Sequence, residues 1–229
     1  MNELPGGFET ERLTLRAIAP DDAPAIFARY AQDPEVVRYL IWRPHRSLED
    51  TEAYIASCLA ASPRHSRTFV LVDRAEGGLL GAFHLRRPEP HRLDCGYVLA
   101  QPFWGRGLMT EALAEVARWA LTAPGIWRIG AVCDVDNRAS ARVMEKAGLA
   151  REGDAHRQAY GPVHRRLGLA ARQIDDEGAQ IVACRTAQAR PRARDLYGAF
   201  RPNNIARWRK SCRRIGRSDT GLGLGTITR

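Results

Sequence analysis

The chain has 229 residues, of which 45% are hydrophobic, and its formal net charge is +9. This length allows one domain of ordinary size with an appendage, or two small domains, and the apolar share permits a sizeable core. No run of apolar residues reaches the roughly 18 that a membrane-spanning helix needs, and the first residues lack a charged-then-apolar signal, so we expect a cytoplasmic protein without membrane contact.

The five cysteines are odd in number, widely spaced and without a zinc-ligand pattern. Reduced thiols are therefore expected in place of disulfides, and no metal site is predicted.

The positive charge is concentrated at the C-terminal end. Residues 173–229 contain twelve Lys and Arg against five Asp and Glu, which places +7 of the net charge there. These residues show no sustained hydrophobic period, so we expect a poorly ordered arginine-rich tail after a domain at 1–172. Two interpretations of the tail stay open: an arm that binds RNA phosphates and bases, or an extension without function.

The N-terminal part predicts a strand and two helices. Residues 9–16 alternate between apolar and polar side chains, as a strand does. Asp21 and Asp22 are placed to cap a helix that continues to Tyr30, and a second helix is predicted at 48–60 after an irregular stretch around Trp42.

The next part predicts an antiparallel arrangement of strands. Residues 68–72 and 79–85 are apolar runs joined through Gly77-Gly78, which is a hairpin signal. A further strand is predicted at 92–99.

The stretch 101–113 joins this strand to a helix with a broad apolar stripe, which begins at Leu108. Two glycines flank Arg106 at the joint, so the backbone amides of the first helical turn are left bare. Bare amides at the positive end of a helix dipole, with an arginine beside them, form a site for a pyrophosphate. The alternative is an ordinary tight turn between strand and helix.

The remaining elements are a strand at 126–133 and a short helix that Asn137 caps and Gly148 ends. Further strands are predicted to begin at Arg151 and to occupy 167–172.

In several of the segments described above, the chain resembles the GNAT superfamily of N-acetyltransferases, in the branch of the ribosomal-protein alanine N-acetyltransferases. The similarity lies in Trp104-Gly105-Arg106-Gly107 with Thr110-Glu111-Ala112, in the opening strand at 9–16, and in the Asn137 to Gly148 segment. It covers roughly 9–172 and is most specific at 94–148. Pro102 stands where the superfamily often has Gln or Arg, which removes one side-chain contact to the ligand. The resemblance implies an α+β fold, a mixed and mostly antiparallel twisted sheet with helices on both faces and splayed central strands.

The resemblance also implies that acetyl-CoA is the co-substrate. The residues that match the family's acetyl-CoA-binding positions are Tyr97, Val98, Leu99, Gly105, Arg106, Gly107, Leu108, Met109, Thr110, Asn137 and Ser140. Asn137 is also explained as a helix N-cap, and Ser140 as a residue of the first helical turn.

Three catalytic candidates follow from the same resemblance. Ser140 matches a serine proposed to protonate the departing thiolate. Asp94 precedes Gly96 and Tyr97 where the family often has an acid facing the acceptor groove, so it is our first candidate for the base that takes the amine proton. His84 is the second candidate, although a lone strand histidine is commonly a packed core residue.

The sequence therefore predicts direct acetyl transfer from acetyl-CoA to a primary amine, on a protein N-terminus or a small molecule, by a monomer or homodimer. No cysteine has a matched histidine at a recognisable spacing, which disfavours an acetyl-enzyme. Two other functions stay open at this point: an RNA- or ribosome-associated binding protein acting through the tail, and an acetyl-CoA-binding module without catalysis.

Overall fold

The structure is a computed structural model, and it describes residues 2–155 and 166–172. These residues belong to one compact unit, Met1–Ile181. The predicted basic tail at 173–229 lies outside the described residues, as does the segment 156–165.

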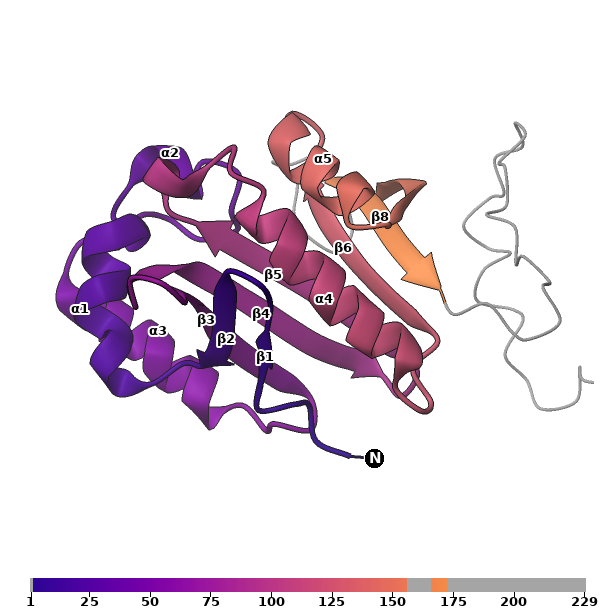
Figure 1. Cartoon of the computed structure of the whole chain (residues 1–229). Helices are drawn as coiled ribbons and strands as arrows, with labels where there is room; N and C mark the ends of the chain where they lie inside the picture. The colour runs from indigo at the N-terminus through magenta and orange to yellow at the C-terminus, as the bar shows by residue number, and fades with distance from the viewer. Residues whose placement is uncertain (1, 156–165, 173–229) are drawn as a thin grey trace, which may run out of the picture. The chain divides into compact units, whose positions relative to one another are not determined.

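A single sheet of eight strands forms the centre of this unit, in the order β1-β2-β3-β4-β5-β6-β8-β7 (Figure 1). The strands are β1 (Gly7–Glu9), β2 (Leu13–Ala17), β3 (Ser66–Asp73), β4 (Leu79–Glu89), β5 (Arg92–Leu99), β6 (Arg128–Asp134), β7 (Ala150–Ala155) and β8 (Arg166–Arg172). Every neighbouring pair is antiparallel except β5 and β6, which are parallel. The predicted mixed, mostly antiparallel sheet is confirmed.

The helical segments cover both faces of the sheet. They are η1 (Pro20–Asp22), α1 (Ala23–Ile26), η2 (Phe27–Ala31), α2 (Pro34–Val37), α3 (Leu48–Ala60), η3 (Gln101–Phe103), α4 (Leu108–Thr122) and α5 (Arg138–Lys146). Helices α4 and α5 contribute side chains to one core cluster, whereas α1, η2 and α3 contribute to the other. Figure 1 shows α4 lying along the sheet face on which α5 also sits.

The apolar stripe of α4 accounts for the larger core. Leu108, Ala112, Val116 and Ala120 follow one another at a spacing of four, and all are buried. Side chains at this spacing lie on one helix face, so the whole face packs against the sheet. This packing fixes the N-terminus of α4 relative to the end of β5.

The parallel pairing of β5 and β6 is short. It joins Arg92–Cys95 to Arg128–Ala131, and no pairing follows beyond Cys95 within the described residues. The rest of β5 stays paired with β4, while the rest of β6 pairs with β8. The two central strands therefore separate after four residue pairs, as the predicted splay requires.

Two predicted elements differ from the structure in detail. The strand predicted at 9–16 is divided into β1 and β2, which pair with each other across a turn. The helix predicted from Asp21 to Tyr30 is a succession of 3₁₀, α and π turns. The N-cap is Ala19 and not an aspartate, but Asp22 contributes to the start of the helix from its first turn, where its carboxylate accepts from the Ala19 amide and from Arg16.

Candidate active site

The loop before α4 has the backbone that its glycines predict. Gly105 and Gly107 have φ values of 73° and 76°, in the left-handed region that side chains disfavour. Gly107 is the N-cap of α4, and no described side chain caps the helix there. The first amides of α4 are thus available to an anion, at the positive end of the helix dipole. A Cβ added at Gly105 would meet nothing within 4 Å, so the space beside the loop is open.

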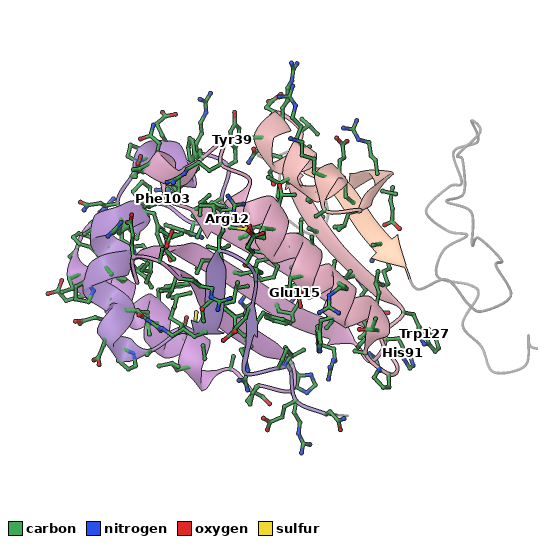
Figure 2. The ribbon with its side chains drawn as sticks, viewed as in Figure 1. Arg12, Tyr39, His91, Phe103, Glu115 and Trp127 are labelled. Carbon is green, nitrogen blue, oxygen red and sulfur yellow. The ribbon has the colours of Figure 1, made fainter. Side chains whose placement is uncertain are left out.

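Arg12 lies in the turn between β1 and β2 and is hydrogen-bonded to this loop (Figure 2). Its Nη1 donates to the Arg106 carbonyl at 3.0 Å, and its Nε donates to the Glu111 carboxylate at 2.6 Å. The Arg12 backbone amide donates to the same carboxylate at 2.9 Å. The turn between β1 and β2 is thereby bonded both to the loop and to the first turn of α4. The sequence analysis missed this contact, because the two partners are separated by 99 positions.

One cavity of about 980 Å³ opens where β5 and β6 separate. Its wall includes residues from both core clusters, so it connects the two faces of the sheet. All the predicted acetyl-CoA-binding residues line it except Arg106, whose guanidinium lies 5.9 Å from the centre of the Phe103 ring.

Tyr97, Asn137 and Ser140 meet inside this cavity. The hydroxyl oxygens of Tyr97 and Ser140 are 2.8 Å apart, and the Tyr97 hydroxyl is also 3.2 Å from the Ser140 carbonyl. The Asn137 side chain accepts from the Ser140 amide, which is the predicted N-cap. Burial raises the pKa of Tyr97 well above its usual range, so its hydroxyl keeps its proton at neutral pH. The sequence analysis named Tyr97 for its backbone position and missed the hydroxyl.

His84 lines the same cavity from β4, on the face covered by α3. Its Nδ1 is 2.9 Å from the Thr68 hydroxyl and its Nε2 is 3.3 Å from the Ser66 hydroxyl. Burial, assisted by the positive charge of Arg86, lowers the pKa of His84 from 6.5, so the imidazole is mostly neutral at neutral pH. The residue opposite it on β5 is Gly96, where an added Cβ would meet nothing within 4 Å. Space beside His84 is therefore open.

Asp94 does not have the position that the sequence analysis expected. It is absent from the cavity wall, and its carboxylate accepts from Arg86 at 3.1 Å and from Arg92 at 2.9 Å. The reason is local: two arginines on the hairpin that joins β4 to β5 lie next to the carboxylate and hold it in place. The prediction that Asp94 faces the acceptor groove is thus not met.

Two further groups complete the wall. Trp104 donates from Nε1 to the Leu99 carbonyl at 2.7 Å, which fills one backbone acceptor at the end of β5. Arg142 and Lys146 on α5 add positive charge on the side of the cavity that holds Ser140. Among the described residues, no three His, Cys, Asp or Glu side chains are grouped as metal ligands would be, and no helix there is long and apolar enough to cross a membrane.

Comparison with known proteins agrees with this architecture. The acetyltransferase (GNAT) domain family matches residues 12–150. The uncharacterized N-acetyltransferase YoaA of Bacillus subtilis (strain 168) is 33% identical over 155 residues, which are 66% of this chain and 87% of YoaA. The uncharacterized N-acetyltransferase p20 of Bacillus licheniformis is 28% identical over 63% of this chain and 82% of p20.

Solved structures show the same fold. The GNAT-family acetyltransferase from Bacillus anthracis has a TM-score of 0.64 at 24% identity, over 72% of this chain and 98% of that one. The ribosomal-protein-S5-alanine acetyltransferase from Vibrio fischeri has a TM-score of 0.60 at 24% identity, over 74% of this chain and 97% of that one. The predicted resemblance to the GNAT acetyltransferases is confirmed. The chain belongs to the acetyltransferase (GNAT) domain family and is an acetyl-CoA-dependent N-acetyltransferase.

Proposed function

We propose that the chain transfers the acetyl group of acetyl-CoA directly to a primary amine, on a protein N-terminus or a small molecule. One observation carries the proposal. A single cavity joins the glycine loop at the N-terminus of α4, the open end of β5, the Ser140 and Tyr97 hydroxyls, and His84. An acyl donor and an amine can therefore meet without leaving the protein.

The residues around the loop suit the donor. Pyrophosphate would be held by the amides after Gly105 and Gly107, and the positive charges of Arg142 and Lys146 favour a phosphorylated ligand. The separation of β5 from β6 leaves the end of β5 at Tyr97, Val98 and Leu99 without a partner strand on that side. Apart from the Leu99 carbonyl, which accepts from Trp104, the backbone groups that face the gap are available to an amide-containing chain such as pantetheine. When bound, acetyl-CoA supplies an activated acyl group as a thioester.

His84, and not Asp94, is our proposed general base. With Nδ1–H donated to Thr68, the Nε2 atom of a neutral imidazole can accept the proton of the amine, directly or through the Ser66 hydroxyl. The α-amine of a protein N-terminus has a pKa of about 7.7–8.0, so only a modest proton transfer is required near neutral pH.

Ser140 is our proposed proton donor to the leaving thiolate. Its hydroxyl is hydrogen-bonded to Tyr97, whose raised pKa keeps a proton available to replace the one that is given up. The two hydroxyls thus form a short proton path on the donor side of the cavity, across from His84.

The cavity also supports transfer without an acetyl-enzyme. Burial raises the pKa of the cavity-lining Cys95 thiol to about 12, so it stays protonated and is a poor nucleophile at neutral pH. Positioning of donor and amine together can then supply much of the rate.

The test combines binding and steady-state kinetics. Acetyl-CoA should raise the melting temperature of the protein, and Gly107→Val should abolish this shift because a side chain there fills the anion site. The matched control is Gly125→Val, which has a similar left-handed φ of 79° outside the cavity wall, and should keep the shift.

Velocity measured against acetyl-CoA and an amine should give intersecting reciprocal plots. Parallel plots, or an acetylated protein isolated without acceptor, would contradict direct transfer. An unchanged acetyl-CoA shift in Gly107→Val would contradict the proposed donor site.

A further inference from the structure

The part of the cavity on the α3 side has an aromatic wall. Tyr30, Tyr39, Trp42 and Tyr54 all line it. The Trp42 and Tyr54 rings both lie near the His45 ring, at 5.0 Å and 5.9 Å between ring centres. His84 lines the same cavity, so the four aromatic side chains, which we call the aromatic wall, share that cavity with the proposed base.

This part of the cavity contains few negatively charged side chains. Among the described lining residues the single carboxylate is Glu35, whose side chain is 62% exposed and lies 3.9 Å from Arg38. Arg38 lines the same wall and is paired with Glu35, so no unpaired carboxylate faces a ligand there among the described lining residues. A polyamine or aminoglycoside carries two or more ammonium groups, and those remaining after one is acetylated would lie there without a counterion.

Tyr30 belongs to this wall through its ring. The residue is 1% exposed and its hydroxyl oxygen is buried, so a ligand in the cavity does not reach that oxygen.

We propose that the acceptor is a monoamine with an aromatic or bulky apolar group beside the amine. This assignment rests on the proposed N-acetyltransferase reaction and names the substrate class for its acceptor side. The apolar group contacts the aromatic wall while the amine lies next to His84.

The test measures release of the CoA thiol by the full-length protein with four amines. L-phenylalaninamide and glycinamide share an amine and an amide and differ in the ring. 2-Phenylethylamine and spermidine are both alkyl amines, but spermidine carries additional charges and no ring. We expect kcat/KM for phenylalaninamide to exceed that for glycinamide by about ten- to a hundredfold, and phenylethylamine to exceed spermidine similarly.

Two variants connect this preference to the named residues. Trp42→Ala should reduce the ratio between phenylalaninamide and glycinamide toward one. Trp127→Ala is the matched control, because Trp127 is an exposed tryptophan stacked on His91 at the far end of α4 (Figure 2), and it should leave the ratio unchanged.

The possible results separate the two proposals. Equal or faster reaction with glycinamide or spermidine, or an unchanged ratio in Trp42→Ala, would overturn the acceptor assignment and leave the acetyltransferase reaction standing. Absence of thiol release with every amine, and also with peptides that begin with alanine, would overturn both proposals.

Discussion

At the scale of single residues, burial sets the protonation of His84 and this has a consequence for stability. Its pKa is lower in the folded protein than the value of 6.5 expected for the unfolded chain. Below that value the unfolded chain binds more protons than the folded one, so protonation favours unfolding. The free energy of unfolding should fall as pH decreases through 6.5 toward the folded-state pKa, and level off below it.

The measurement is denaturant unfolding between pH 7.5 and 5, with His84→Gln beside the natural sequence. The variant should show a flatter pH dependence in this window. His45 also has a pKa lowered by burial, with Asp50 opposing the effect, so His45→Gln should remove a further part of the slope with the same sign. If His84→Gln leaves the slope unchanged, the histidine is not protonated differently in the two states.

The hydroxyl pair of Tyr97 and Ser140 gives a second prediction at this scale. Because the two oxygens are 2.8 Å apart and act on the same proton, Ser140→Ala and Tyr97→Phe should each lower kcat by about ten- to a hundredfold, with little change in acetyl-CoA affinity. The double variant should be no slower than the slower single variant. Asp94→Asn is the control for these variants, because the Asp94 carboxylate is paired with Arg86 and Arg92. We expect its kcat to stay within about twofold of the natural protein, as for an ordinary surface substitution. Additive losses in the double variant would show that the hydroxyls act separately.

At the scale of elements, the contact from Arg12 to the glycine loop is testable. The pair of Arg12 and Glu111 is partly exposed, with side chains 46% and 20% accessible, so its contribution is about 1 kcal/mol at most. Arg12→Ala should therefore weaken acetyl-CoA binding by about fivefold, because the variant lacks the hydrogen bond that Arg12 donates to the Arg106 carbonyl of the loop. Titration calorimetry measures this change.

The matched control for this prediction is Arg74→Ala. Arg74 also donates from Nη1 to a carbonyl of the same turn, that of Thr10 at 2.7 Å, but it makes no contact with the glycine loop in the described structure. Its loss should leave acetyl-CoA affinity unchanged. Equal weakening by both variants would mean that the turn as a whole, and not the Arg12 contact, supports the loop.

Most elements of this fold were predictable from local pattern. The helix at 48–60 and the strand at 92–99 have the predicted bounds, because a long apolar period and nearby turn residues fix such elements within a short window of sequence. The glycine loop was predictable for the same reason, since a left-handed φ at Gly105 and Gly107 is a property of the residue type.

The parts that escaped prediction depend on contacts between distant residues. Arg12 and Glu111 are 99 positions apart and carry no local signal for each other. The hydroxyl contact of Tyr97 with Ser140 likewise exists because α5 folds back over the open end of β5. No short window of the sequence contains these distances.

At the scale of the whole molecule, every residue of the proposed site precedes 155. Removing 173–229 should therefore preserve acetyl-CoA binding, and acetyl-CoA at about a hundred times Kd should still raise the free energy of unfolding by about 2.7 kcal/mol. Because the removed residues carry a charge of +7, the salt dependence of any RNA binding should fall in the shortened protein. A shortened protein that folds but no longer binds acetyl-CoA would place part of the site beyond 172.

The short parallel pairing of β5 with β6 means that few backbone hydrogen bonds join the two parts of the sheet. Past Cys95 each strand has a strand partner only on its outer side within the described structure, β4 for β5 and β8 for β6. A ligand chain that lies in this gap can bond both sides at once, and so act mechanically as a substitute for the missing strand contacts. Amide hydrogen exchange at the inner edges of β5 and β6 would then slow on binding and recover on product release. The stiffness of the sheet would thus rise and fall with each catalytic cycle.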